Sequence, residues 1–360
     1  MKKFRYLLNG FLILAGFVLL VAISFFTYLS FTEYKPDQIC HLEISKKGIS
    51  IPGNIRAFNL LTWNIGYSGL GKDMDFFYDG GSRVKAPFND YQANLNGILS
   101  ALKAMDTLDF VLLQEVDREA KRSFFTDQVA IFSNELKDFN VSFAKNYDVK
   151  YIPFPLLDPM GKVLAGLASF SRFIPSESVR ISSPLNFPWP KRLFFLDRCF
   201  LINRYPITKD TSLLVINIHN SAWSEGAVLR KEELKVLKKI ITAEYKKGNY
   251  VIVGGDWNQN PPGFNPKKFE NDDKVWVLQP PLEKDFMPDN WHWAYDVKKP
   301  SNRDVSQAYK KGQALTTVID AFLLSPNVSV VDIRTLDFGF EYSDHNPVYL
   351  SVRLGVSQVL

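Results

Sequence analysis

A long run of uncharged residues fills the N-terminal part of the chain. No Asp, Glu, Lys, Arg or His occurs from Tyr6 to Thr32. At about 1.5 Å of rise per residue, a helix over this run is long enough to cross a hydrocarbon core of roughly 30 Å. We therefore expect residues 1–34 to form a short flank and a transmembrane helix.

The charges on either side of this run predict its orientation. Lys2, Lys3 and Arg5 precede it, and Glu33 follows it. Because basic residues stay on the cytoplasmic side, we expect a single-pass membrane protein with a cytoplasmic N-terminus and an extracytoplasmic remainder. The alternative is a cleaved signal peptide, but the run exceeds the usual apolar region of about 7–15 residues and no small-x-small cleavage site follows it.

After a polar connector, residues 35–56, the pattern changes to apolar runs separated by turn residues. Such runs predict buried strands, and three longer amphipathic stretches predict helices. The strands are Phe58–Trp63, Phe110–Gln114, Val163–Phe170, Cys199–Tyr205, Leu213–Ile218, Tyr250–Val253, Thr317–Leu324, Val328–Ile333 and Val348–Leu354, and the helices are Asp90–Met105, Asp127–Leu136 and Glu225–Lys247. This mixture predicts one α/β domain over residues 57–360, with two packed sheets flanked by helices.

Composition excludes several classes of protein. The 360 residues are 46% apolar and 22% charged, which excludes a disordered or fibrous chain. A formal net charge of +5 is far from the strongly basic surface of a dedicated nucleic-acid binder. Two cysteines cannot form a disulfide framework, and four histidines argue against a multi-histidine metal cluster. A metal in this chain would therefore have mainly oxygen ligands.

Polar residues of a narrow set recur where predicted strands end. One carboxylate, Asp320, lies within the apolar run Thr317–Leu324, where burial is costly unless the group is paired, hydrogen-bonded or bound to a metal. Each residue alone has a structural explanation, but the set together indicates a site. The segments are Thr62-Trp63-Asn64, Leu113-Gln114-Glu115, Asn217-Ile218-His219-Asn220, Gly254-Gly255-Asp256-Trp257-Asn258 and Ser343-Asp344-His345-Asn346-Pro347.

The residue types in this set suit hydrolysis of a phosphate ester. Glu115 and Asn64 offer hard oxygen ligands of the kind that Mg²⁺ accepts. Histidines beside carboxylates can transfer protons near neutral pH and face a phosphoryl group with positive charge. We expect Asp344 to accept a hydrogen bond from one imidazole nitrogen of His345, which leaves the other nitrogen free to take a proton from water.

The ordered series of motifs resembles the endonuclease/exonuclease/phosphatase superfamily over roughly residues 57–356. The two most specific elements are 255–258 and 343–348. Trp257 stands where the family usually has Phe, and Asn220 stands where it usually has Leu. The resemblance implies a four-layer α/β sandwich, with two mixed sheets face to face and helices outside.

The resemblance also implies a metal site and a role for the fourth motif. Glu115 would be the main ligand of Mg²⁺, for which Mn²⁺ can substitute, with Asn64 beside it. Asp256 and Asn258 would hold and orient the phosphate and the attacking or leaving oxygen.

Further roles follow from the same resemblance for the histidines. His345, oriented by Asp344, would be the general base. His219, supported by Asp320, would bind and polarise the phosphoryl oxygens.

Two positions in the wall of the site are less defined by the motifs. Arg198 resembles the phosphate-contacting arginine of DNase I-like members, and a surface arginine is the equal alternative. Tyr147 and Tyr151 compete for the active-site tyrosine of the family.

We therefore expect a membrane-anchored, Mg²⁺-dependent phosphodiesterase of the endonuclease/exonuclease type, in which water attacks phosphorus in line. The substrate would be nucleic acid or a lipid headgroup, and no obligate protein partner is evident. One alternative is a sphingomyelinase-like phospholipid phosphodiesterase, for which Trp189 and Phe194 in the stretch 186–195 would touch the headgroup layer. The other is an inactive, membrane-tethered binding module, although no acid, base or metal position is lost.

Overall fold

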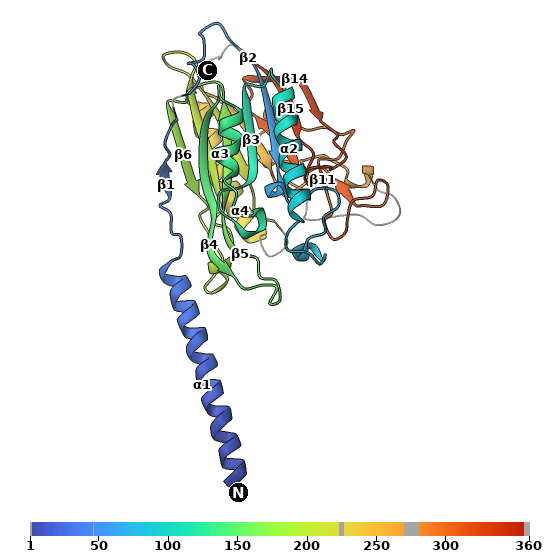
Figure 1. The fold of residues 1–360 in the computed structure, drawn as a ribbon. Helices are drawn as coiled ribbons and strands as arrows, with labels where there is room; N and C mark the ends of the chain where they lie inside the picture. The colour runs from blue at the N-terminus through green and yellow to red at the C-terminus, as the bar shows by residue number, and fades with distance from the viewer. Residues whose placement is uncertain (1, 46, 223–226, 270–280, 356–360) are drawn as a thin grey trace.

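The computed structural model describes residues 2–45, 47–222, 227–269 and 281–355, and shows a helix leading into a sandwich of two sheets (Figure 1). The helices are α1 (Lys2–Phe31), α2 (Phe88–Ala104), α3 (Gln128–Glu135) and α4 (Ala227–Lys246). One sheet has the order β1 (Ile39–His41), β6 (Glu177–Ser182), β7 (Cys199–Pro206), β8 (Ser212–His219), β9 (Tyr250–Asp256), β13 (Asp320–Leu324) and β10 (His292–Ala294). The other has the order β14 (Val328–Thr335), β15 (Val348–Leu354), β2 (Ala57–Asn64), β3 (Phe110–Asp117), β5 (Gly161–Ser171) and β4 (Asn140–Ile152), and a separate pair is formed by β11 (Asn302–Arg303) and β12 (Thr316–Thr317).

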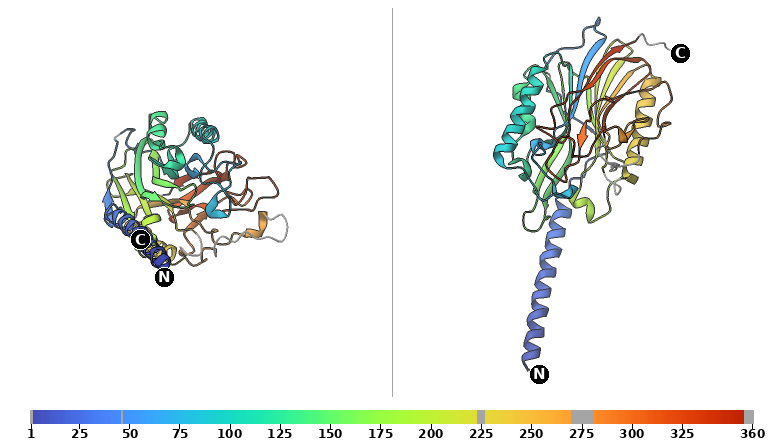
Figure 2. Two further views of the ribbon diagram at one scale, coloured as in Figure 1. Left: turned by 60° about the horizontal axis from the view of Figure 1, so that its bottom comes forward. Right: turned by 90° about the vertical axis from the view of Figure 1, so that its right-hand side faces the viewer.

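The core separates into layers because successive residues of a strand point to opposite faces. In β2, Leu60 packs between the two sheets, whereas Leu61 packs toward α2 and α3. Leu237 and Ile241 of α4 cover the outer face of the other sheet. Figure 2 shows the helices on the two outsides of the sandwich. The predicted four-layer α/β sandwich is thereby confirmed.

Most of the predicted elements are present, with two instructive differences. The run Thr317–Leu324 divides into β12 and β13, so Asp320 is the first residue of a strand and not an interior one. The 13-residue strand β4 was not predicted, because it buries Asn140, Ser142 and Asn146 where an apolar alternation would be expected. The predicted start of the third helix, at Glu225, lies outside the described residues.

Helix α1 extends away from the sandwich, and nearly all of its side chains are exposed. By length and composition it is able to cross a membrane. Its last turns contact the domain, where Leu29 is buried. The described residues of the segment 35–56 then run along the sandwich, because β1 pairs with β6 and Ile49 forms a bridge with Phe173.

The parallel strand pairs determine where polar side chains gather. β2 is parallel to β3, with Asn64 level with Gln114, and β8 is parallel to β9, with His219 level with Asp256. Because the carboxyl ends of parallel strands meet at one edge of a sheet, both sheets present their motif residues at the same end of the sandwich.

Candidate active site

A pocket of about 160 Å³ lies at this end of the sandwich. Nine of the ten candidate site residues line it, and the tenth, Asp320, lies directly behind His345. The lining candidates are Asn64, Glu115, Tyr147, Arg198, His219, Asp256, Asn258, Asp344 and His345.

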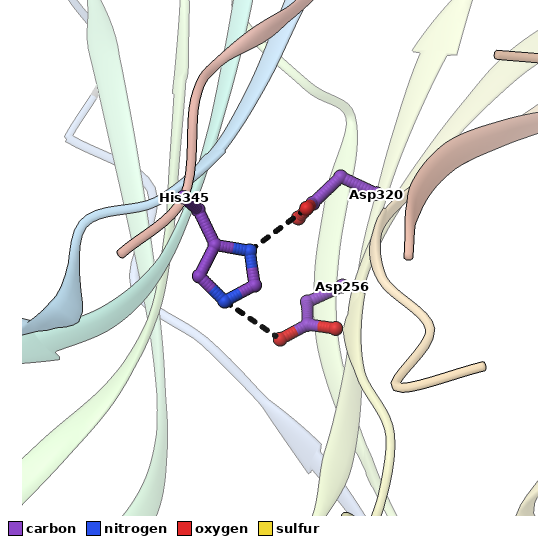
Figure 3. Close-up of side chains that lie close together, drawn as sticks. All are labelled: Asp256, Asp320 and His345. Atoms are coloured by element: carbon purple, nitrogen blue, oxygen red, sulfur yellow. Dashed lines mark hydrogen bonds and ion pairs between the residues drawn. The ribbon is translucent and has the colours of Figure 1, made fainter. Parts of the chain in front are cut away.

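The carboxylate that pairs with His345 is Asp320, not Asp344. His345 Nδ1 lies 2.8 Å from Asp320 Oδ2, and Ser301 Oγ donates to the same oxygen at 2.7 Å. Figure 3 shows the imidazole of His345 turned toward Asp320. Asp344 Oδ2 lies 3.8 Å from the other ring nitrogen, Nε2. Asp320 therefore sets the orientation of the imidazole, and the expectation that Asp344 does so is wrong.

His219 is correspondingly separate from Asp320. Its Nε2 lies 3.4 Å from Asp256 Oδ2 and 4.0 Å from Glu115 Oε1. Burial, reinforced by the nearby Arg198, lowers the pKa of His219 well below its ordinary value. His219 is therefore neutral near pH 7, and the positive charge facing a phosphoryl group comes from elsewhere.

Glu115 enters the pocket because strand β3 bulges beside it. The pairing of β3 with β5 shifts register between Leu113 and Val116, and Glu115 has a φ of 54°. A bulge with a left-handed residue re-aims a side chain at the edge of a sheet. Asn64 Nδ2 then lies 3.2 Å from Glu115 Oε1 and 3.1 Å from Asp256 Oδ2, so the amide links the two carboxylates.

The turn after β9 fixes Asp256 and Asn258. A Cβ on Gly255 would lie 2.0 Å from the carbonyl oxygen of Ile218, so only glycine fits this position. Asn258 adopts a φ of 53°, and its backbone N–H donates to Asp256 Oδ1 at 2.8 Å. Its side-chain amide donates to the carbonyl of Asn220. This closed turn holds both polar side chains toward the pocket.

Negative charge is concentrated at the base of the pocket. Burial raises the pKa of Asp256 to about 7 and that of Asp344 to about 6. Burial alone would lower the pKa of His345, but Asp320 and the other carboxylates outweigh it and raise that pKa to about 10. His345 is therefore a cation at neutral pH within this carboxylate cluster.

The donor set fits a hard divalent cation. Glu115 is partly exposed to the pocket, and Asp256 Oδ2 is linked to it through the Asn64 amide nitrogen, while Asn64 Oδ1 accepts a hydrogen bond from the Gly66 N–H. Oxygen ligands at a solvent-accessible position are those that Mg²⁺ prefers. Asp256, Asp320 and His345 also lie within metal-binding distance of one another, but there a hydrogen bond already joins two of the three.

Arg198 and Tyr147 both belong to the pocket wall. Arg198 is partly buried and donates to the carbonyl oxygen of His219 at 3.2 Å. The hydroxyl of Tyr147 donates to the carbonyl of Phe194 at 2.9 Å. Tyr151 does not line this pocket and instead packs against Phe25 of α1.

Two features of the site were missed from the sequence. The first is Asn302, whose amide nitrogen lies 2.9 Å from His345 Nε2. Asn302 belongs to a strand of two residues, which is too short to show a periodic pattern in the sequence. Below the pocket, Arg122 forms a buried ion pair with Asp117 and stacks on Tyr67. Nothing in the sequence around Asp117 and Arg122 indicates that this ion pair is buried and not on the surface.

Comparison with known proteins gives one family and several similar folds. The model of the Endonuclease/Exonuclease/phosphatase family matches residues 61–345. An endonuclease/exonuclease/phosphatase from Beutenbergia cavernae shares 18% identity over 85% of this chain and 74% of its own, with a TM-score of 0.53. One from Bacteroides vulgatus shares 15% over 83% of this chain and 100% of its own, with a TM-score of 0.51.

A third similar structure is that of ANGEL2, a 2′,3′-cyclic phosphatase, in complex with adenosine-2′,3′-vanadate. It shares 15% identity over 88% of this chain and 99% of its own, with a TM-score of 0.51. No curated protein matches the chain. At these identities the structural likeness concerns the fold alone.

Proposed function

Because the chain belongs to the endonuclease/exonuclease/phosphatase family, a family of phosphoric ester hydrolases, we propose that it is a Mg²⁺-dependent phosphodiesterase. The proposal rests mainly on the presence, in one pocket, of a group that can transfer a proton and of a group that can bind a metal ion. Asp320 and His345 form a hydrogen-bonded pair, and Glu115 presents its carboxylate oxygens to the same pocket, with the Asn64 amide beside them. Proton transfer and charge stabilisation are the two requirements of phosphate ester hydrolysis.

The residues divide the work of hydrolysis among them. Asp256 and Asn258 hold the attacking water and the phosphate in line, because their turn fixes both side chains. Because His345 is a cation at neutral pH, it acts by giving up a proton, and it does so at Nε2, since Nδ1 is bonded to Asp320. Arg198 supplies the positive charge facing the phosphoryl oxygens, with neutral His219 as a hydrogen-bond partner.

Glu115 would be the main ligand of the metal in this proposal, with Asn64 beside it. When bound, Mg²⁺ neutralises charge on the phosphoryl oxygens and orients the phosphate. The crowding of carboxylates at the base of the pocket supports a bound cation in the working enzyme, because like charges in a buried site destabilise one another.

We propose further that α1 anchors the enzyme, with the catalytic domain on the extracytoplasmic side. The support is the uncharged run of α1 and the basic residues Lys2, Lys3 and Arg5 before it. An inactive binding module is the less favoured alternative, because each acid, base and metal position carries a suitable side chain.

Turnover of a substrate panel tests the proposal. Purified full-length protein in detergent is given plasmid DNA, sphingomyelin, inositol phosphates and bis-p-nitrophenyl phosphate, with Mg²⁺ or with EDTA. We expect Mg²⁺-dependent hydrolysis of at least one diester, and its loss in His345→Ala. Absence of hydrolysis across the panel, or hydrolysis that His345→Ala leaves unchanged, would contradict the proposal.

A further inference from the structure

The pocket and the end of α1 lie at the same end of the sandwich. From α1 the chain passes along β1 at the edge of one sheet, and β2 then runs back so that its carboxyl end points toward the end of the sandwich from which α1 emerges (Figure 1). Figure 2 shows α1 projecting from this end in a second view. The strand ends that carry the motif residues are therefore on the side of the domain from which the apolar helix emerges.

Aromatic side chains join α1 to the domain there. The ring of Phe25 lies 6.3 Å from that of Tyr151 and 6.4 Å from that of Phe194, and the ring of Phe26 lies 5.8 Å from that of Trp189. Trp189 Nε1 also donates to Ser30 Oγ at 3.2 Å. These contacts, which we call the aromatic junction, fix the helix against the domain.

An ion pair continues this junction beyond the helix. Arg192 Nε lies 2.7 Å from Glu33 Oε1. The first residues after α1 are therefore held to the loop 186–195 as well.

The aromatic junction lies at the expected level of a membrane surface. About 20 residues of helix cross the hydrocarbon core, which places the far boundary near Phe25 and Phe26 if Arg5 marks the near one. Aromatic side chains concentrate at this boundary in membrane proteins. The domain surface that carries the junction would therefore rest on the bilayer.

The junction and the pocket share a wall. Phe194, which packs on α1, also lines the pocket, and its carbonyl accepts the hydrogen bond from Tyr147. Apolar side chains of Phe195, Leu196 and Met160 line the pocket beside the carboxylates. A substrate that reached the pocket along this wall would pass from an apolar to a charged surface.

The hairpin between β4 and β5 adds exposed apolar residues on the same side. It begins at Tyr151, which contacts Phe25. At its tip Leu156 is 79% exposed, Leu157 is fully exposed and Phe154 is more than half exposed. Three such side chains together are unusual on a surface that faces only water.

We propose that this hairpin, 153–159, inserts into the bilayer surface and that the pocket takes the phosphodiester of a membrane lipid headgroup. The substrate class rests on the proposed hydrolytic function, whereas the seating of the hairpin does not. We take the lipid bilayer as the partner of this surface because the apolar helix α1 joins the surface directly, through the aromatic junction. Hydrolysis in place would break one P–O bond of the headgroup diester, with water supplying the oxygen and the proton.

Insertion of the hairpin into the bilayer surface, its seating, is tested by fluorescence in an experiment that does not depend on activity. Full-length protein with Cys40→Ser and Leu157→Cys is labelled with the environment-sensitive dye NBD and reconstituted in nanodiscs of phosphatidylcholine, phosphatidylglycerol and sphingomyelin. The control carries the label at Val331, which is 61% exposed on β14, the edge strand opposite β4 in the same sheet. We expect a blue shift and quenching by brominated lipid at position 157 only. Equal spectra at the two positions would overturn the seating.

Substrate class is tested by turnover in the same nanodiscs. With Leu156→Glu and Leu157→Glu combined, we expect headgroup release to fall at least about tenfold, while hydrolysis of soluble bis-p-nitrophenyl phosphate is unchanged. Val331→Glu should change neither rate.

The pattern of failure separates the two proposals. Hydrolysis of soluble diesters, glycerophosphocholine and DNA included, without release of any lipid headgroup would overturn the lipid substrate and leave the hydrolytic function standing. No hydrolysis of any diester would overturn the hydrolytic function, while the dye still reports whether the hairpin is seated.

Discussion

The protonation of His345 is governed by the carboxylates around it, and Asp320 is the nearest of them. Replacing that carboxylate by an amide removes the strongest stabilisation of the imidazolium. We therefore predict that Asp320→Asn lowers the pKa of His345 and reduces kcat by about 10²–10⁴-fold. The pKa is measured by ¹³C-histidine NMR, in which four histidines give a simple spectrum.

Asp344→Asn is the matched comparison for that variant. Because Asp344 is farther from the ring, its replacement should lower the pKa of His345 by less. A larger decrease in Asp344→Asn than in Asp320→Asn would return the orienting role to Asp344.

Asp197 makes stability depend on pH in a predictable direction. Burial raises its pKa to about 7, with Arg180 opposing and Glu33 adding to the shift, whereas the unfolded chain has a value of about 3.9. A raised folded-state pKa gives stability that is present below the unfolded value and is lost as the pH rises through the folded value. Stability should therefore fall between about pH 4 and pH 7.

Asp197→Asn removes this loss because the amide does not titrate. Its melting temperature should exceed that of wild type by at least about 3 °C at pH 8, and the difference should shrink toward pH 4. Differential scanning calorimetry across this range measures it. A difference that is constant with pH would show that Asp197 keeps its ordinary pKa.

The motif residues of the site could be predicted from the sequence, but the contacts between them could not. Asp344 precedes His345 in the chain, which made it the expected partner, yet neighbouring residues of extended chain point in different directions. The true partner, Asp320, reaches His345 across the join between two sheets, and Asn302 comes from a two-residue strand. Such long-range contacts leave no trace in local periodicity.

Among the elements, strands buried on both faces were the easiest to predict. β2, β3 and β9 are continuous apolar runs because helices or the other sheet cover each face. Strands β4 and β6 were missed because they place polar side chains at buried positions, Ser178 and Arg180 in the case of β6. The bulge in β3 that turns Glu115 into the pocket is a backbone feature with no side-chain pattern.

The charges around helix α1 predict on which side of the membrane each end of the helix lies. We propose that the domain lies outside the membrane, so in cells that express the full chain with Cys40→Ser, a membrane-impermeant maleimide should label Val331→Cys without lysis. Lys3→Cys, at the other end of the helix, should be labelled only after the membrane is opened. The reverse pattern would place the domain in the cytoplasm and exclude extracytoplasmic substrates.

For the whole molecule, the arrangement of the sheets explains why one end of the sandwich carries the chemistry. Both sheets contain a parallel pair whose strands end together, so residues more than 250 positions apart in the chain, such as Asn64 and His345, line one pocket. The sequence predicted the two layers of strands and the helices outside them. It could not predict that α1 emerges beside the pocket, because that depends on the direction of β1 and β2 in three dimensions.

The central claim is that this pocket hydrolyses a phosphodiester with a metal held by Glu115. The most direct test is the initial rate of bis-p-nitrophenyl phosphate hydrolysis against Mg²⁺ concentration, for wild type, Glu115→Gln and the control Glu119→Gln, whose side chain is exposed and pairs with Lys162. We predict a saturable Mg²⁺ dependence in wild type and the control, abolished by EDTA, and a rate at least about 10³-fold lower in Glu115→Gln. Wild-type rates and Mg²⁺ affinity in Glu115→Gln would contradict the account.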